Sequence, residues 1–240
     1  MKSFGAALAG LMCYVIFLVA TIPATFINTL LAHYLDQNIQ IANAQGTLWH
    51  GSGNLDGMEE INWKIKTPEL LLGHLHALVV SNDAAHPMDV FISPARIELK
   101  HITLTLPATL LSDFGRPLKL MAPGGRLRLS IEDFSVSDTF LGNVDLNWQN
   151  ASSALSRVSP IGTYHFHITG LGHHLNIHLD TQDGPLFLAG KGNWSLQGGM
   201  YFTGTARSEN EQLLALLNLV GKPAENGTYS FTTLNIGPQT

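Results

Sequence analysis

Apolar and polar residues alternate along most of this chain, and this pattern predicts β-strands. In residues 60–66, for example, Ile61, Trp63 and Ile65 share one face while polar side chains share the other. The same alternation predicts a strand-turn-strand segment over residues 39–57 and further strands over residues 74–81, 88–92, 96–106, 126–131, 143–149, 163–169, 174–180, 184–196, 199–206 and 229–236. Because short connections join successive strands, we expect each strand to pair with its neighbour in one antiparallel sheet system.

One stretch departs from this alternation: residues 4–22, FGAALAGLMCYVIFLVATI, form an uncharged apolar run after Lys2. The length of this run is close to the roughly 20 residues that a helix needs to cross the hydrocarbon core of a bilayer. We therefore expect a transmembrane helix here. The residues expected inside the membrane include Phe4, Gly10, Cys13, Phe17 and Ile22.

The basic residues near this run predict its orientation. Lys2 precedes the run, and residues 23–63 contain no Lys or Arg. Since basic residues favour the cytoplasmic side, we expect a single-pass protein of a bacterial inner membrane, with a cytoplasmic N-terminus and most of the chain in the periplasm. A cleaved signal peptide is the alternative, although the bulky Ile22 stands where a small residue is preferred before cleavage. The single cysteine, Cys13, leaves the exported part without a possible disulfide.

These patterns predict a mainly β protein: an N-terminal transmembrane helix, then an elongated, twisted antiparallel β-sheet, groove-like or partly rolled, with a few short helices. Residues 1–35 are expected to hold the cytoplasmic N-terminus, the transmembrane helix and a juxtamembrane helical extension, and residues 36–240 the periplasmic β-rich domain. Thr67-Pro68 predicts one short helix. A capping box at Ser208-Glu209-Asn210-Glu211 predicts a second, just before an apolar helical face.

A weak internal repeat suggests duplication of residues 46–135 as residues 136–236. Ile61-Asn62-Trp63 resembles Leu146-Asn147-Trp148, and a His-x-His strand follows each of them. Two copies of a hairpin-rich unit are one explanation of this echo, and chance similarity is the other.

Charge and catalytic motifs exclude several classes of function. The chain has 13 Lys and Arg against 18 Asp and Glu, a net charge of −5, and no basic block. Nucleic-acid binding therefore lacks its electrostatic basis. A Gly-x-Ser-x-Gly nucleophile motif and a phosphate-binding loop are both missing, and the adjacent carboxylates Glu132 and Asp133 would point to opposite faces of a strand. We expect a protein that is not an enzyme and needs no cofactor.

Histidine is the residue type that most suggests ligand chemistry, since 11 are present. Alternation places His165 and His167 on one face of a strand, and His174 and His178 on the same face of its expected partner. Neutral imidazoles so placed are possible zinc or copper ligands. No cysteine lies outside the apolar run, and we expect no Asp or Glu to gather near these histidines beyond Asp180 and Asp183. We therefore expect solvated or cross-strand-paired histidines and no metal.

Glycines alternate with large side chains in two segments, GTLWHGSG (residues 46–53) and GPLFLAGKGNWSLQGGMYFTGTA (residues 184–206). This pattern is typical of aromatic rings packed over glycine backbone in a twisted sheet, or of an apolar groove or docking surface. Residues that would contact a partner or line such a groove are Trp49, Trp63, Leu188, Trp194 and Phe202.

Together with LLALLNLVGKPAENGTYSF (residues 213–231), these segments resemble the type II secretion system protein N family. The resemblance implies a non-enzymatic inner-membrane accessory or assembly component, whose periplasmic β-rich domain contacts other secretion components. The implied partners are inner-membrane platform proteins of that system and membrane lipid, with a homo-oligomer also possible. The alternative is a periplasmic lipid- or hydrophobe-binding groove protein of the envelope-biogenesis type, which rests on analogy of fold.

Overall fold

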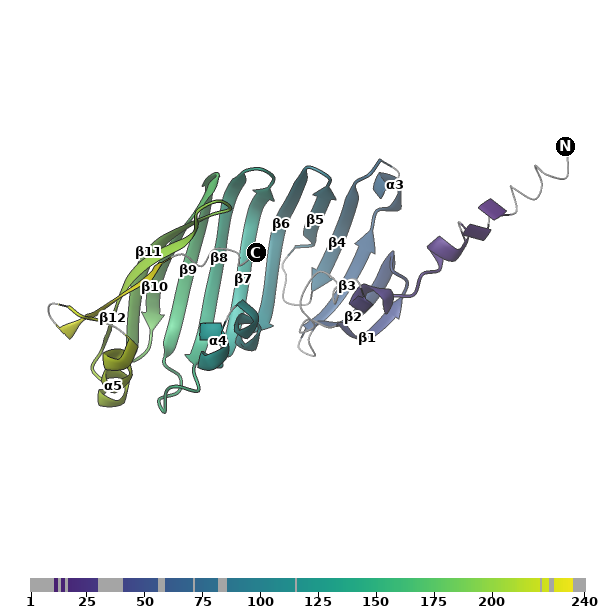
Figure 1. Ribbon diagram of the computed structural model, residues 1–240. Helices are drawn as coiled ribbons and strands as arrows, with labels where there is room; N and C mark the ends of the chain where they lie inside the picture. The colour runs from purple at the N-terminus through teal and green to yellow at the C-terminus, as the bar shows by residue number, and fades with distance from the viewer. Residues whose placement is uncertain are drawn as a thin grey trace, which may run out of the picture. The chain divides into compact units, whose positions relative to one another are not determined.

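The computed structural model describes residues 11–12, 14–15, 17–29, 41–55, 59–70, 72–81, 86–114, 116–220, 222–224 and 227–234 (Figure 1). The chain divides into two compact units, Met1–Ile92 and Ser93–Thr240. These ranges hold fourteen strands and only short helices. Neighbouring strands within each unit are antiparallel. The predicted mainly β class with a few short helices is confirmed.

The first unit contains five strands in chain order, each hydrogen-bonded to the next. They are β1 (Ile41–Gly46), β2 (His50–Leu55), β3 (Glu59–Ile65), β4 (Leu75–Ser81) and β5 (Met88–Ser93). Helix α3 (Thr67–Leu70) connects β3 to β4, where Thr67-Pro68 predicts a helix start. Ile61 and Trp63 are buried with Ile41 in a small core. The face that alternation assigned to β3 is therefore the buried one.

The N-terminal apolar segment is helical in its described residues up to residue 20, and residues 26–29 form a second helical turn. Within the described ranges, no helix combines the length and the apolar character that crossing a membrane requires. Phe4, Gly10 and Cys13, three of the residues predicted to lie in the membrane, fall outside the described residues. Phe17 is helical, and Ile22 follows the end of the helix.

The second unit continues with nine strands, again mostly in chain order. They are β6 (Arg96–Pro107), β7 (Gly124–Val136), β8 (Phe140–Ser152), β9 (Gly162–Gly172), β10 (His174–Asp183), β11 (Leu186–Ser195), β12 (Gly199–Ser208), β14 (Tyr229–Leu234) and the short β13 (Lys222–Pro223). The last two exchange places in the sheet, so that β14 pairs with β12 and β13 lies outside it. The 3-10 helix η1 (Ala108–Phe114) and helix α4 (Arg116–Met121) connect β6 to β7, and helix α5 (Glu211–Val220) follows β12.

We call the strands of the first unit the first sheet and those of the second unit the second sheet. One face of the second sheet is apolar and forms the main core. Leu127, Trp148 and Tyr164 are direct neighbours across β7, β8 and β9 and are 5%, 7% and 1% exposed. Ala108 of η1 and Leu213 of α5 belong to the same cluster and are fully buried. In Figure 1, α4 and α5 lie beside the lower ends of the strands in this view. Through Ala108 and Leu213, η1 and α5 cover part of the apolar face, and the opposite face carries polar side chains.

Helix α5 begins differently from the prediction. The sequence favoured Ser208 as the capping residue of a capping box, but Asn210 caps the helix: its Oδ1 accepts a hydrogen bond from the Gln212 N–H at 3.0 Å. The hydroxyl of Ser208 instead donates to the Pro185 carbonyl at 2.7 Å and accepts from the Asn210 N–H at 3.1 Å. Ser208 is the last residue of β12 and therefore cannot cap the helix. Asn210, a residue type that favours the cap position, caps it instead.

A bulge between β7 and β8 depends on a glycine. The register shifts between Ile131 and Phe134, and Gly142 lies opposite Phe134 with φ +109°. A Cβ at this position would overlap the carbonyl oxygen of Asp133. We expect Gly142→Ala to lower the free energy of unfolding by about 3 kcal/mol, because both the backbone conformation and the contact oppose the added carbon. Urea unfolding followed by tryptophan fluorescence measures this loss.

Gly172→Ala is the matched control for the bulge. Gly172 also has a positive φ, +73°, but a Cβ there would meet nothing within 4 Å. This change should cost only about 1 kcal/mol, from backbone strain alone. Equal losses for the two variants would contradict the claim that the contact with Asp133 limits position 142.

Candidate functional site

The two tryptophans of the first unit that the sequence singled out form hydrogen bonds within the chain. Trp63 is buried, and its indole N–H donates to the Leu48 carbonyl at 3.1 Å. Trp49 is half-buried, and its indole N–H donates to the Val19 carbonyl at 2.7 Å. Trp63 therefore packs in the core of the first unit and bonds to the turn between β1 and β2. Trp49 attaches the β1–β2 hairpin to the N-terminal helix. A contact between Trp49 and a partner stays a prediction.

The three candidates in the second unit pack against the chain itself. Phe202 is buried and stacks on Phe231 with ring centroids 6.1 Å apart. Trp194 meets Phe140 edge-on at 5.5 Å, and Leu188 packs against the main core. The glycines of this segment serve that packing, since a Cβ at Gly190 or Gly192 would overlap the Phe202 ring. Binding of another molecule by these residues stays a prediction.

Several hydrogen bonds join the N-terminal segment to the first sheet. The Leu48 N–H donates to the Ile22 carbonyl at 2.8 Å, and the Ala24 N–H donates to the Gly46 carbonyl at 3.1 Å. The Asn28 side chain donates to the Ile41 carbonyl and accepts from the Ile41 N–H, both at 2.9 Å. The N-terminal segment is thus connected to β1 and to the turn between β1 and β2.

An apolar hollow of about 760 Å³ lies at this junction. Val15, Val19 and Ala20 of the helix line it together with Trp49 of the hairpin and Pro68 and Leu70 of α3. Leu72, which follows α3, is 75% exposed. The end of the first sheet that carries the N-terminal helix is therefore also an apolar end.

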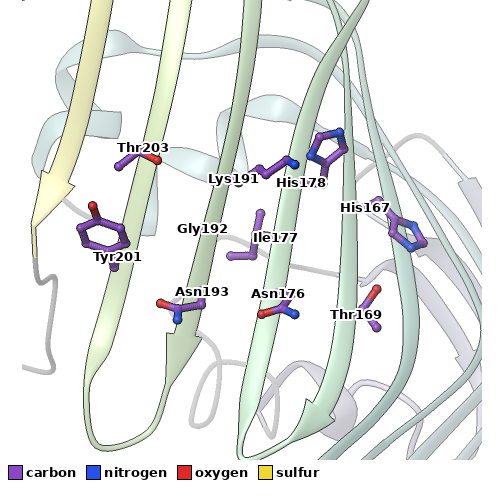
Figure 2. A pocket seen from close by; sticks show the side chains of 10 residues that line it. All are labelled: His167, Thr169, Asn176, Ile177, His178, Lys191, Gly192, Asn193, Tyr201 and Thr203. Carbon is purple, nitrogen blue, oxygen red and sulfur yellow. The ribbon is translucent and has the colours of Figure 1, made fainter.

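The open face of the second sheet is organised in rows of polar side chains, because directly paired residues of neighbouring strands point to the same face. One row crosses six strands and consists of Ser130, Asp145, His167, His178, Lys191 and Thr203. The adjacent row consists of Asn143, Thr169, Asn176, Asn193 and Tyr201. Figure 2 shows the parts of both rows that lie on β9 to β12. We call this open face of the second sheet the polar face.

The polar face contains a hollow of about 470 Å³ between β9 and β12 (Figure 2). Asn176 and Asn193 point into the hollow from neighbouring strands, and Lys191 supplies a positive charge. His167 borders this hollow and also a second one on the side of β7, which Asp145 lines. His167 therefore lies where the two hollows meet.

Beside His167 the polar face carries a compact group of ionisable side chains. Asp145 Oδ1 on β8 lies 2.8 Å from His167 Nδ1 and 2.9 Å from His165 Nε2, both on β9. The other ring nitrogen of His165, Nδ1, lies 3.4 Å from Asp180 Oδ1 on β10. Partial burial acts to raise the pKa of Asp145, but the hydrogen bonds from His167 and His165 outweigh it and hold the pKa below its ordinary value. Asp145 is thus a carboxylate held between two imidazoles.

Sequence reasoning found the histidines of this group and missed Asp145. The expected pairing of His165 and His167 with the following strand is correct, since His178 lies opposite His167 and Asp180 opposite His165. The expectation that carboxylates do not gather near the histidines is wrong, because Asp145 reaches them from the preceding strand. The alternation of Val144 and Leu146 places Asp145 on the polar face, but only the register of β8 against β9 brings it to His167.

A smaller group of similar composition lies in the first unit. His76 on β4 has Nδ1 3.0 Å from Glu69 Oε2 and Nε2 2.7 Å from Asp89 Oδ1. His76 belongs to β4, the first of the two His-x-His strands, and the strand before it carries the buried Trp63. In the second unit, the strand before β9 carries the buried Trp148 at the matching place. The suggested duplication stays a prediction.

The fold and these contacts define a class: an antiparallel β protein whose first sheet is joined to an apolar N-terminal helix. The model of one protein family, type II secretion system (T2SS) protein N, matches residues 37–232. The chain belongs to this family. No match was found among curated proteins or among solved structures. Membership implies a role in type II secretion, a membrane-associated location and interaction with other components of that system.

Proposed function

We propose that this protein is a non-enzymatic accessory or assembly component of the type II secretion system, held in the bacterial inner membrane by one helix. The family match over residues 37–232 carries this proposal. The uncharged run of residues 4–22, with Lys2 before it, supports a single span with a cytoplasmic N-terminus. The β-rich part then lies in the periplasm, where the other secretion components can reach it.

The junction of the helix with the first sheet suggests how the protein is held at the membrane. Trp49 bonds to the Val19 carbonyl at the end of the apolar helix, which is where an aromatic side chain would meet the lipid headgroups. The exposed Leu72 and the apolar hollow lie at the same end of the unit. We infer that this end touches the membrane surface and contacts inner-membrane platform proteins.

Photocrosslinking in living cells tests this proposal. A photoreactive residue replaces Leu72, and a second strain carries it at Leu155, which is 52% exposed in the second unit. We expect Leu72 to capture a platform protein of the secretion system or membrane lipid. If cells secrete normally and neither position captures any secretion component, the proposed partners are wrong.

Secretion itself supplies the second measurement. Deleting the gene should leave substrates of the type II system in the periplasm, and the wild-type gene should restore their release. Normal secretion and normal assembly of the platform in the deletion strain would contradict an accessory role.

A further inference from the structure

We propose that Asp145, His165 and His167 form a zinc-binding site on the polar face of the second sheet. One ligand atom from each of these residues lies within 4.8 Å of the other two. Among the described residues, this is the one group of three or more His, Cys, Asp or Glu side chains that meets this criterion. The donor set is two imidazole nitrogens and one carboxylate oxygen, which suits zinc and disfavours magnesium and calcium, whose ligands are oxygens.

The distances leave room for an ion after a small movement. Zinc bonds of about 2.0–2.1 Å in tetrahedral geometry separate neighbouring ligand atoms by about 3.3 Å. Asp145 Oδ1 now lies 2.8 Å and 2.9 Å from the two ring nitrogens that face it. The two oxygen–nitrogen pairs therefore need to open by about half an ångström. The side chains of His165, Asp145 and His167 are 25%, 39% and 42% exposed, so they can turn without disturbing the core and an ion can enter from solvent.

Asp180 provides an independent argument for a metal ligand at His165. Histidines that bind zinc usually donate their second ring N–H to a carboxylate, which fixes the ring and its tautomer. His165 turns Nε2 to Asp145 and Nδ1 toward Asp180 Oδ1, 3.4 Å away. His165 can therefore bind the ion through Nε2 while Asp180 orients the ring at Nδ1. This arrangement makes Asp180 a positioning residue of the proposed site.

The sheet supplies the rigidity that such a site needs. The ligands and Asp180 come from β8, β9 and β10, three neighbouring strands within the sheet. On the opposite face these strands carry the buried Trp148, Tyr164 and Leu179. His178 lies opposite His167 on β10 and is the nearest further nitrogen donor by register. The site leaves a coordination position facing solvent, which water or a partner's side chain would fill.

The group around His76 in the first unit is a weaker candidate. It offers one imidazole between Glu69 and Asp89, so only one nitrogen donor is present.

The test uses the full chain in detergent micelles, purified without a polyhistidine tag, which would itself bind metal. Zinc affinity is measured by competition with a chromophoric chelator, and cobalt(II) is added separately because its visible absorption reports tetrahedral coordination. We expect one zinc per chain and a tetrahedral cobalt spectrum. His165→Ala with His167→Ala should weaken zinc binding by about 100-fold or more and abolish that spectrum, and Asp180→Asn should weaken binding by about ten-fold.

His174→Ala is the control, because His174 is an exposed histidine of β10 outside the group. This variant should bind zinc within about two-fold of the wild type. Zinc should also raise the melting temperature of the wild type and of the control, but not that of the double variant. Equal affinity of the wild type and the double variant, or zinc spread over several weak histidine sites, would overturn the proposal. If the double variant does not fold, an unchanged affinity in Asp180→Asn together with an octahedral cobalt spectrum in the wild type would overturn it equally.

Discussion

The variant Tyr14→Arg with Phe17→Arg is expected to leave the membrane fraction and to lose function in secretion. Both side chains lie on the apolar N-terminal helix and are 59% and 63% exposed, so they do not pack on the β-sheet. An Arg near the centre of a span costs about 3 kcal/mol of insertion free energy, and two cost about 6 kcal/mol. That amount is enough to prevent stable insertion of a single helix. Carbonate extraction followed by immunoblotting measures the loss, with release of a secreted substrate as the functional readout.

The control for this variant is Tyr14→Phe with Phe17→Leu, which keeps the helix apolar and should remain in the membrane and support secretion. The intact mass of the membrane-bound protein separates a retained helix from the cleaved alternative, since cleavage would remove the residues before the new N-terminus. Retention of the double Arg variant after carbonate extraction would show that the helix is not what holds the protein in the membrane.

Local alternation was sufficient to predict most strands. Ile61 and Trp63 in β3, and Tyr164 and Phe166 in β9, face the cores that their period of two predicts. Each such strand is half-buried, so its sequence records directly which face is covered. The chain-order pairing within each unit also followed from the short connections.

Features that depend on distant residues could not be predicted in this way. Strand β7 extends to Val136 beyond the expected residue 131, because a bulge opposite Gly142 restores its apolar face after Glu132 and Asp133. Helix α4, with the sequence RPLKLM, is too short to show an apolar period. Asp145 joined the histidines only through the register of β8 with β9, which no single segment records. The fold was therefore largely predictable, but the charged group on the polar face was not.

Leu213→Ala is expected to be the most destabilising single truncation in α5. Leu213 is fully buried and belongs to the same cluster as Phe202 and Ala206 of β12, so its side chain attaches the helix to the sheet. Truncating a fully buried leucine removes apolar contacts and leaves a cavity, at a cost of about 2–5 kcal/mol. The free energy of unfolding, from urea titration followed by tryptophan fluorescence, should fall by that amount.

Gln212→Ala tests whether this loss comes from packing. Gln212 is the exposed neighbour in the first turn of the helix, and its backbone N–H keeps the bond to Asn210 Oδ1 whatever the side chain. This change should alter the stability by less than about 0.5 kcal/mol, as for other exposed positions. A loss of stability at position 212 as large as that at position 213 would mean that helix formation limits the stability. A small loss at both positions would mean that α5 contributes little to the core, and that the apolar face of β12 is covered in some other way.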